Sequence, residues 1–309
     1  MKLIVSVCIL AYNHEKYIKQ AIESVLIQKT NFDYEIVIGE DCSKDNTKKI
    51  AVNFQNRYPD KIKLINNKKN LGGLLNFIKI LKACKGEYVA LLDGDDYWTD
   101  PSKLQKQVDF LTSNQDYSIC SHNVYVIDEK NKTPPFEWLG SEHRNISTLE
   151  NILEYGSGGA SCSLVFRRKC MTPLPKWFNS LPSGDWAIQV LCTSKGKMYY
   201  SREIMAVYKK HSGGATDYKR GSQKELDAFL TGGIDLCRTF DKAFYYRYSK
   251  IIKKNLINYM YPNLVEIYLY RGENKLARKY ASLILNEIFV GSFPPINRFV
   301  KYVLLFCRK

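Results

Sequence analysis

Short apolar segments alternate with helical patterns along the first third of the chain. The apolar segments are rich in β-branched residues, as strands are, and apolar residues recur at helical spacing between them. Strands are expected at 3–10, 34–39, 61–66 and 87–92, and helices at 15–28, 45–57 and 71–84. This order predicts an α/β domain, in which helices cover both faces of a Rossmann-like, mostly parallel sheet. Ligands of such sheets bind outside the carboxyl ends of the strands.

The fourth of these strands ends in three carboxylates within four residues. The sequence there runs Glu87-Tyr-Val-Ala-Leu-Leu-Asp93-Gly-Asp95-Asp96. Like charges packed this closely repel one another, and a divalent cation is the usual compensation. Carboxylate oxygens favour Mg²⁺ or Mn²⁺ over zinc, and such ions commonly enter a site with substrate phosphates. The alternative is an acidic turn that leads into the helix begun by Pro101.

Two other predicted strands end in residues that suit a nucleotide. Tyr12 and Asn13 follow the first strand, and Asp41 follows the second. An aromatic face can stack on a base, and a carboxylate can accept a hydrogen bond from a base N–H. Together with the acidic cluster, these residues predict a nucleotide pocket with a metal-bridged phosphate site. Taken singly, Tyr12 could be a core aromatic and Asp41 the cap of a turn.

The loop after the first strand argues against several other nucleotide-dependent classes. The Gly-x-Gly-x-x-Gly of dinucleotide-binding folds is replaced by Ala11-Tyr-Asn-His-Glu15, and the chain has no Gly-Lys-Ser/Thr loop. A dehydrogenase or a P-loop phosphotransferase is therefore not expected. A sugar-1-phosphate nucleotidyltransferase is an open alternative, but the Gly-rich basic loop that it needs at this position is missing.

The composition is that of a globular protein with a strongly basic balance. Forty-six Lys and Arg against thirty-one Asp and Glu give a net charge of +15, which favours nucleotide phosphates, acidic lipid or nucleic acid as partner. No recognition motif supports nucleic acid. The nine cysteines contain no Cys-x-x-Cys pair, which suits a reducing cytosol. No segment reaches the roughly 18 to 20 apolar residues that cross a bilayer, so we expect a cytoplasmic protein.

The pattern becomes mixed after the fourth strand and helical toward the C-terminus. A polar, turn-rich segment at 128–147 is predicted to be a loop. The basic, aromatic C-terminal helices and the tail at 294–309 could lie on an anionic membrane surface, dock on the catalytic core or serve a homodimer. We expect a domain at 1–218, with the predicted nucleotide pocket in its first half at about 1–115, and a helical region at 219–309.

Four blocks of the sequence, in order, resemble the family 2 glycosyltransferases. They are Val5-Ser-Val-Cys-Ile-Leu-Ala-Tyr-Asn-His14, Tyr34-Glu-Ile-Val-Ile-Gly-Glu-Asp-Cys-Ser-Lys-Asp-Asn-Thr47, Asn70-Leu-Gly-Gly73 and Gly86-Glu-Tyr-Val-Ala-Leu-Leu-Asp-Gly-Asp-Asp-Tyr-Trp98. The resemblance covers about residues 3–215 and implies a GT-A fold, with a nucleotide-binding half at about 1–115 and an acceptor half at about 116–218. It also implies an inverting, metal-dependent enzyme of the hexosyltransferase type. Such an enzyme moves a sugar from a UDP-sugar to a hydroxyl of a glycan or lipid-linked glycan, in the biosynthesis of surface polysaccharides or glycoconjugates.

The resemblance also implies roles for individual residues. Tyr12 would stack on the base, Asp41 would bind the N3–H of uracil, and the acidic cluster would hold the ribose and a Mn²⁺ or Mg²⁺ ion. The residues implied for nucleotide-sugar binding are Ala11, Tyr12, Asn13, Asp41, Asn70, Asp93, Gly94, Asp95 and Lys210. Those implied for the metal are Asp95, Asp96 and His211. Where the family often has glycine, this chain has Cys42.

Asp185 resembles the acidic residue that serves as general base in this family. It stands in Ser183-Gly-Asp-Trp186, at the start of a predicted helix. A base there would take the proton of the acceptor hydroxyl as the new bond forms. Helix N-capping is the alternative role for Asp185. A non-catalytic protein that recruits glycan-assembly partners to membranes is the alternative from another functional class.

The segment Tyr208-Lys-Lys-His211 resembles a place where the family often has Tyr-Arg-x-His. His211 could reach the metal or the diphosphate, or it could be a structural histidine. Lys209 or Lys210 could meet phosphate as a point charge. Lysine lacks the two-pronged contact that arginine makes with phosphate.

Overall fold

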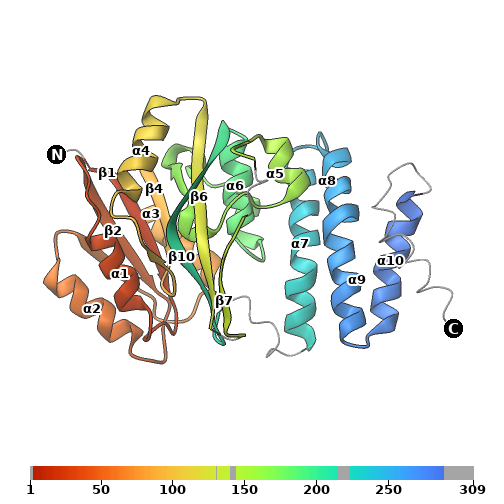
Figure 1. The fold of residues 1–309 in the computed structure, drawn as a ribbon, viewed down its shortest axis with the longest axis horizontal. Helices are drawn as coiled ribbons and strands as arrows, with labels where there is room; N and C mark the ends of the chain where they lie inside the picture. Colours follow the sequence, from red (N-terminus) through yellow and green to blue (C-terminus); the bar gives the residue numbers. More distant parts are fainter. Residues whose placement is uncertain (1–2, 130, 140–143, 215–222, 289–309) are drawn as a thin grey trace. The chain divides into compact units, whose positions relative to one another are not determined.

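The computed structural model describes residues 3–129, 131–139, 144–214 and 223–288. The chain divides into two compact units, Met1–Ile152 with Ser157–Arg220 and Leu153–Gly156 with Gly221–Lys309. The first unit is an α/β structure and the second is helical (Figure 1). No helix in the described part of the chain is both long and apolar enough to cross a membrane.

The first unit begins with strands and helices in strict alternation. They are β1 (Leu3–Ala11), α1 (Ile18–Leu26), β2 (Asp33–Glu40), α2 (Thr47–Arg57), β3 (Ile62–Asn66), α3 (Gly73–Ala83) and β4 (Tyr88–Asp93). A short strand and a helix follow, β5 (Tyr97–Trp98) and α4 (Lys103–Ser113). The strands and helices expected from the apolar pattern of the first ninety residues are thus confirmed, with ends that shift by a few residues.

The rest of this unit is less regular. Its longer elements are β6 (Tyr117–Asp128), α5 (Leu149–Tyr155), α6 (Asp185–Thr193) and β10 (Lys197–Lys210). The short strands are β7 (Thr133–Glu137), β8 (Ile146–Ser147) and β9 (Val165–Arg167), and the short 3₁₀ segments are η1 (Ser161–Ser163), η2 (Arg168–Met171) and η3 (Lys176–Ser180).

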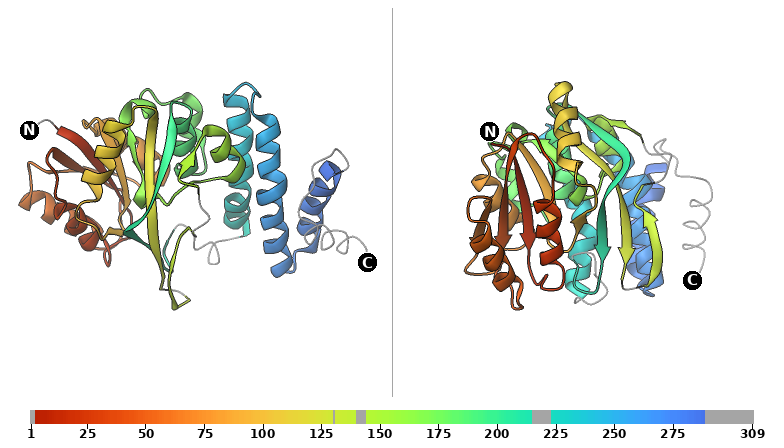
Figure 2. Two further views of the ribbon diagram at one scale, coloured as in Figure 1. Left: turned by 45° about the horizontal axis from the view of Figure 1, so that its top comes forward. Right: turned by 60° about the vertical axis from the view of Figure 1, so that its left-hand side comes forward.

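All described strands join one sheet, in the order β3-β2-β1-β4-β9-β6-β10-β5. The pairs β1·β2, β2·β3, β1·β4 and β6·β10 are parallel, whereas β9 runs antiparallel to both β4 and β6. Helices lie on both faces, as the two views of Figure 2 show. The sheet therefore confirms the predicted mostly parallel α/β architecture.

The β1 strand is buried on both faces, which explains its continuous apolar sequence. Val5, Val7 and Ile9 are fully buried in a cluster that includes apolar residues of α1. On the opposite face, Cys8 contacts Cys84 at the end of α3, with 3.3 Å between the sulfur atoms. Strand β1 is thus the centre of the nucleotide-binding half that the sequence predicts.

The predicted loop at 128–147 contains two strands, so this prediction is wrong in part. The β7 strand pairs antiparallel with β6, and β8 pairs with β10. Every residue of β7 is exposed, and it includes Pro134 and Pro135. An exposed edge strand lacks the alternation of apolar and polar residues by which strands are recognised, so the polar composition misled the prediction.

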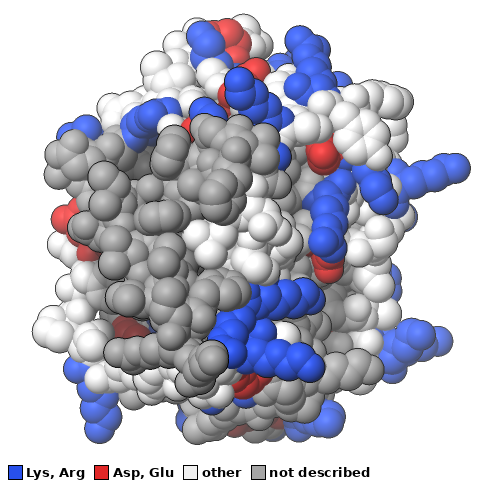
Figure 3. Space-filling model, turned by 90° about the vertical axis from the view of Figure 1, so that its right-hand side faces the viewer, with Lys and Arg blue, Asp and Glu red and all other residues white. Residues whose placement is uncertain are grey.

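The second unit consists of α7 (Gln223–Ala243), α8 (Ser249–Asn255), a π-helical turn at Leu256–Met260, α9 (Tyr261–Tyr270) and α10 (Asn274–Ile288). Gly272 adopts φ +75° between α9 and α10, a conformation that favours glycine. The core of the unit includes Leu264, Tyr268, Tyr280 and Ile284. Figure 3 shows many Lys and Arg side chains and fewer acidic ones on the face it displays.

Gly86, just before β4, offers a test of the central strand pairing. A Cβ atom at Gly86 would lie 2.5 Å from the backbone N of Ser6 and 2.6 Å from the carbonyl carbon of Val5. These backbone atoms of β1 cannot withdraw without disturbing the sheet. We expect Gly86→Ala to lower the free energy of unfolding by about 1–3 kcal/mol, measured by urea titration.

Gly73→Ala is the matched control, since a Cβ atom there meets nothing within 4 Å. At this position in α3, alanine should leave stability unchanged or raise it by up to about 1 kcal/mol. Equal losses in the two variants would contradict the close approach of Gly86 to β1.

Candidate active site

The acidic turn after β4 is held against the end of β1. Asp93 lies opposite Leu10 in the parallel β1·β4 ladder. The N–H of Gly94 donates to the Leu10 carbonyl (2.7 Å), and the N–H of Asp96 donates to the Asp93 carbonyl (3.1 Å). A Cβ at Gly94 would lie 2.7 Å from His14 Nδ1. Glycine is therefore required for the turn to approach the loop after β1.

Asp93 faces two oxygen-bearing side chains from the later part of the first unit, those of Ser161 and Asp185. Ser161 Oγ donates to Asp93 Oδ2 at 2.6 Å. Burial raises the pKa of Asp93 to about 7, and the negative charges of Asp185 and Asp95 act in the same direction. The structure therefore brings Asp93 and Asp185 into one site although they are distant in sequence.

Ser161 is held in place by contacts to the rest of η1. Trp98 Nε1 donates to the Cys162 carbonyl (2.8 Å), and Gln107 Nε2 donates to the Ser163 carbonyl (2.9 Å). The ammonium of the fully buried Lys103 donates to Gln107 Oε1 at 2.7 Å. Strand β5 and helix α4 thus fix the turn that presents the Ser161 hydroxyl to Asp93.

Asp185 is the first residue of α6, and Gly184 occupies the N-cap position. Gly184, and not Asp185, is therefore the N-cap residue of α6. The Asp185 side chain is exposed. Surrounding protein groups nevertheless displace water from its carboxyl, and this desolvation raises its pKa. A carboxylate of raised pKa is a stronger base than an ordinary aspartate.

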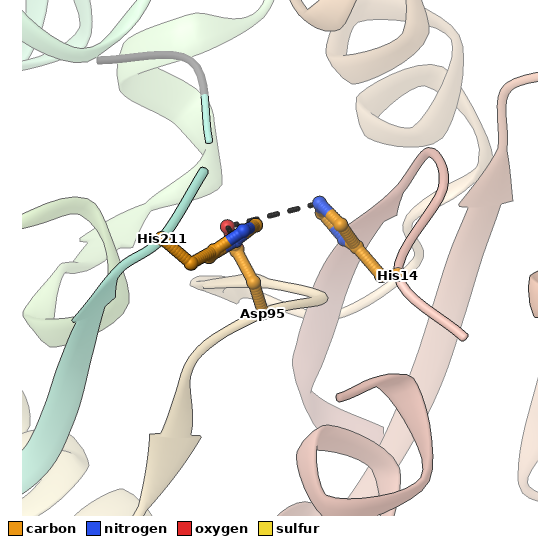
Figure 4. Close-up of side chains that lie close together, drawn as sticks. All are labelled: His14, Asp95 and His211. Carbon is orange, nitrogen blue, oxygen red and sulfur yellow. Dashed lines mark hydrogen bonds and ion pairs between the residues drawn. The ribbon is translucent and has the colours of Figure 1, made fainter. Parts of the chain in front are cut away.

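Asp95 lies between two histidines that come from different elements (Figure 4). Its Oδ2 is 2.9 Å from Nε2 of His211, after β10, and 3.7 Å from Nε2 of His14, after β1. Burial disfavours ionisation of Asp95, but the His211 hydrogen bond and the charges of both histidines outweigh it and lower the pKa. Asp95 is therefore the readily ionised member of the acidic turn.

His14 is a residue whose place in this cluster the sequence reasoning missed. Burial lowers the pKa of its imidazole, which the Asp95 charge offsets in part. Its position directly after the Tyr12-Asn13 pair, at the same strand end, was the signal that could have pointed to it. A neutral imidazole has a lone pair available for a metal.

Asp96, which the sequence also suggests as a metal ligand, is not among the three residues of this cluster, and its role as a ligand stays a prediction. It is 1% exposed, and its Oδ1 accepts a hydrogen bond from the N–H of Lys209 in β10 at 2.8 Å. Burial raises the pKa of Asp96 well above its usual range, and the charges of Asp95 and Asp93 add to the effect. The structure gives Asp96 a direct role in joining the acidic turn to β10.

The loops after β1 and β2 form the remainder of the predicted nucleotide pocket. Tyr12 is 37% exposed, so part of its side chain is accessible to a ligand. Asn13 has φ +56°, donates its N–H to Ser43 Oγ (3.0 Å) and accepts from the N–H of Lys44 (2.8 Å). The carbonyl of the buried Ala11 accepts from the N–H of Asp41 at 2.9 Å. The two strand ends are thus bonded to each other.

Asp41 organises the loop that contains Asn70. Its carboxylate accepts from Asn67 Nδ2 and from the N–H of Leu71, both at 2.9 Å, and from the N–H of Gly72 at 2.8 Å. Exposed Asn70 also accepts from the Gly72 N–H, at 3.0 Å. A carboxylate can accept about four hydrogen bonds, so Asp41 retains capacity for one more donor.

Cys42 has φ +61°, in the left-handed region that favours glycine. The resemblance places glycine at this position in many relatives. Cys42 therefore adopts a backbone conformation that suits glycine, at a conformational cost of about 1–2 kcal/mol, and adds a thiol to the loop.

Lys210 is another sequence-predicted site residue that does not belong to the cluster around Asp95. Its ammonium lies over the rings of Phe136 and Trp138, 5.5 and 5.9 Å from their centroids. Consecutive strand residues point to opposite faces, so Lys210 points away from the face of Lys209 and His211. Lys209 lies over the rings of Tyr17 and Tyr97 instead.

The donor set of His14, Asp95 and His211 fits a divalent metal ion. One ligand atom from each residue lies within 4.8 Å of the others, within the described part of the chain. A carboxylate and two imidazoles suit Mn²⁺ and its transition-metal neighbours.

The family 2 glycosyl transferase model matches residues 6–171. An uncharacterized glycosyltransferase of Nostoc sp. is 31% identical, over 79% of this chain and 76% of the relative. An uncharacterized protein of Mycobacterium tuberculosis is 35% identical, over 68% of this chain. The chain covers 59% of the length of that mycobacterial relative.

Solved structures share the fold. TarS 1-349 of S. aureus, in complex with UDP-GlcNAc, has a TM-score of 0.62 at 19% identity and covers 82% of this chain and 72% of its own. The mannosyltransferase PcManGT of Pyrobaculum calidifontis, in complex with GDP-Man and Mn²⁺, has a TM-score of 0.56 at 14% identity. The match covers 100% of this chain and 82% of PcManGT. These likenesses support the GT-A fold, and the family match shows that the chain belongs to glycosyl transferase family 2.

Proposed function

We propose that the protein is a metal-dependent, inverting glycosyltransferase that moves a sugar from a UDP-sugar to a hydroxyl of a glycan or lipid-linked glycan. The observation that carries the proposal is the convergence of Asp185 with Asp93 beside the pair of Asp95 and His211. One site thus offers a general base and a cation-binding carboxylate. The solved neighbours with UDP-GlcNAc and with GDP-Man and Mn²⁺ support a nucleotide-sugar donor and a divalent ion.

The nucleotide end of the site supports a uracil base. The side chain of Tyr12 is partly accessible, and Asp41 has room to accept one further hydrogen bond, as from the N3–H of uracil. Ala11, Asn13 and Asn70 complete the loops around these two side chains.

Asp185 takes the proton of the acceptor hydroxyl as the acceptor oxygen attacks the anomeric carbon. Its raised pKa brings its basicity closer to neutral pH, where a general base is most effective. Asp95 and His211 would hold the cation, and Asp96 would support them through its bond to β10. A divalent cation bound there would stabilise the negative charge on the leaving diphosphate.

We assign transfer to residues 1–218, with the donor in 1–115 and the acceptor in 116–218. The helical region at 219–309 would attach the enzyme to the anionic inner face of the cell membrane, where lipid-linked acceptors occur. Its basic residues support this assignment, since Lys and Arg near a charged lipid surface contribute roughly 1 kcal/mol each.

Two carboxylate variants test this division of roles. Asp95→Asn should abolish Mn²⁺-dependent UDP binding, because it removes the carboxylate between the histidines. Asp185→Asn should retain UDP binding and lower turnover by roughly 10²- to 10⁴-fold, because it removes the base. Titration calorimetry with UDP and release of UDP across a panel of UDP-sugars give the two readouts.

Glu150→Gln is the matched control, since it removes an exposed acid from the first turn of another helix, α5. Its turnover should equal that of the wild type. The proposed function is wrong if the wild-type protein with Mn²⁺ neither binds UDP nor releases it from any UDP-sugar.

The raised pKa of Asp93 predicts an unusual dependence of stability on pH. An aspartate in the unfolded chain has a pKa of about 3.9. The native protein therefore binds more protons than the unfolded chain between about pH 4 and pH 7, and its free energy of unfolding falls as pH rises through this window. A buried carboxylate thus lowers stability at neutral pH.

Asp93→Asn should relieve this loss in metal-free protein. We expect the free energy of unfolding of Asp93→Asn minus that of the wild type to rise by about 2 kcal/mol between pH 5 and pH 8. Urea unfolding in the presence of EDTA measures both values. Asp109→Asn, which changes an exposed aspartate of α4, should show no such trend. A constant difference between Asp93→Asn and wild type at all pH values would contradict the assigned environment of Asp93.

A further inference from the structure

His14 belongs to the cluster around Asp95 but has no part in the proposed function. It comes from the loop after β1, whereas Asp95 follows β4 and His211 follows β10. Figure 4 shows the two imidazole rings approaching the carboxylate from opposite sides. Three segments that are distant in sequence thus place one nitrogen, one oxygen and another nitrogen together.

The contacts of His14 do not satisfy its ring. Its Nε2 is 3.7 Å from Asp95 Oδ2, which is too long for a hydrogen bond. Its Nδ1 is buried, near Gly94, and has no hydrogen-bond partner. Buried polar atoms are nearly always partnered, so a purely structural histidine would be expected to make better contacts.

The same distances suit two ligands of one ion. Two donor atoms that each lie about 2.1 Å from one metal ion are roughly 3.0 Å apart when the donor–metal–donor angle is a right angle. They are up to about 4.2 Å apart when they lie on opposite sides of the ion. The distances of 2.9 Å from His211 and 3.7 Å from His14 to Asp95 Oδ2 approximate this range. An ion among the three residues would give His14 Nε2 a closer partner than Asp95 Oδ2, which lies 3.7 Å away.

We propose that His14 is a third protein ligand of the cation, and that the two imidazoles make the site select Mn²⁺ over Mg²⁺. The inference rests on the proposed function, which supplies the cation. Mg²⁺ is bound almost wholly through oxygen and gives up its waters reluctantly. Imidazole nitrogen favours transition metals, so each histidine ligand shifts the preference away from Mg²⁺.

Replacing His14 by glutamine tests the selectivity, because glutamine keeps a polar side chain and removes the nitrogen ligand. Affinities of the full chain for Mn²⁺ and Mg²⁺ are measured by titration calorimetry with UDP present. We expect His14→Gln to weaken Mn²⁺ binding about tenfold or more and to leave Mg²⁺ binding within about twofold. Lys16→Ala, an exposed change in the same loop, should leave both affinities unchanged.

A spectroscopic measurement gives a second readout. It needs no enzymatic activity, and it can be made on the wild-type protein as well as on His14→Gln. Pulsed electron paramagnetic resonance of bound Mn²⁺ should detect two coupled imidazole nitrogens in the wild type and one in His14→Gln. A single nitrogen in the wild type overturns the inference even if His14→Gln fails to fold.

The remaining outcomes separate the inference from the proposed function. An unchanged ratio of Mn²⁺ to Mg²⁺ affinity in folded His14→Gln overturns the role of His14 alone. Loss of both ions in Asp95→Asn supports the shared site. A wild-type protein that binds neither ion with UDP overturns the proposed function and the inference together.

Discussion

Repulsion among the carboxylates at the end of β4 is the constraint around which the site is arranged. The three acids of the turn have different surroundings, so they do not all ionise alike. Two histidines keep the pKa of Asp95 low, whereas burial raises the pKa of Asp93 and of Asp96. Groups whose pKa values are separated in this way can take separate roles in one reaction. The turn thus places an ionised carboxylate beside a more protonated one within three residues.

The sequence predicted the part of the fold in which local pattern and burial agree. Strands β1, β2 and β4 are covered on both faces, so their residues read as apolar runs that end sharply in polar residues. The ends of parallel strands share one edge, which is why Tyr12, Asp41 and the acidic cluster could be assigned to one crevice. The family confirms the overall architecture, while the individual roles of these residues stay predictions.

The features that the sequence did not reveal depend on long-range pairing. All five residues of strand β7 are exposed, and only its pairing with β6 makes it part of the sheet. In the sequence, nothing distinguishes His14 from any other polar residue after a strand. Only the fold, through β4 and β10, places Asp95 and His211 beside it. The direction of Lys210 follows from its register in β10, which a motif of consecutive residues does not specify.

The bond between Asp96 and the N–H of Lys209 joins residues that are far apart in the sequence of the first unit. Strand β10 also leads directly to His211, so both the support of the acidic turn and one imidazole arrive late in synthesis. Domains fold as units while the chain emerges from the ribosome, and contacts between distant residues form last. A nascent chain that ends before β10 therefore carries the acidic turn and His14 without His211 and without the Lys209 N–H that bonds to Asp96. Order of synthesis thus delays completion of the cluster of His14, Asp95 and His211 until β10 has emerged.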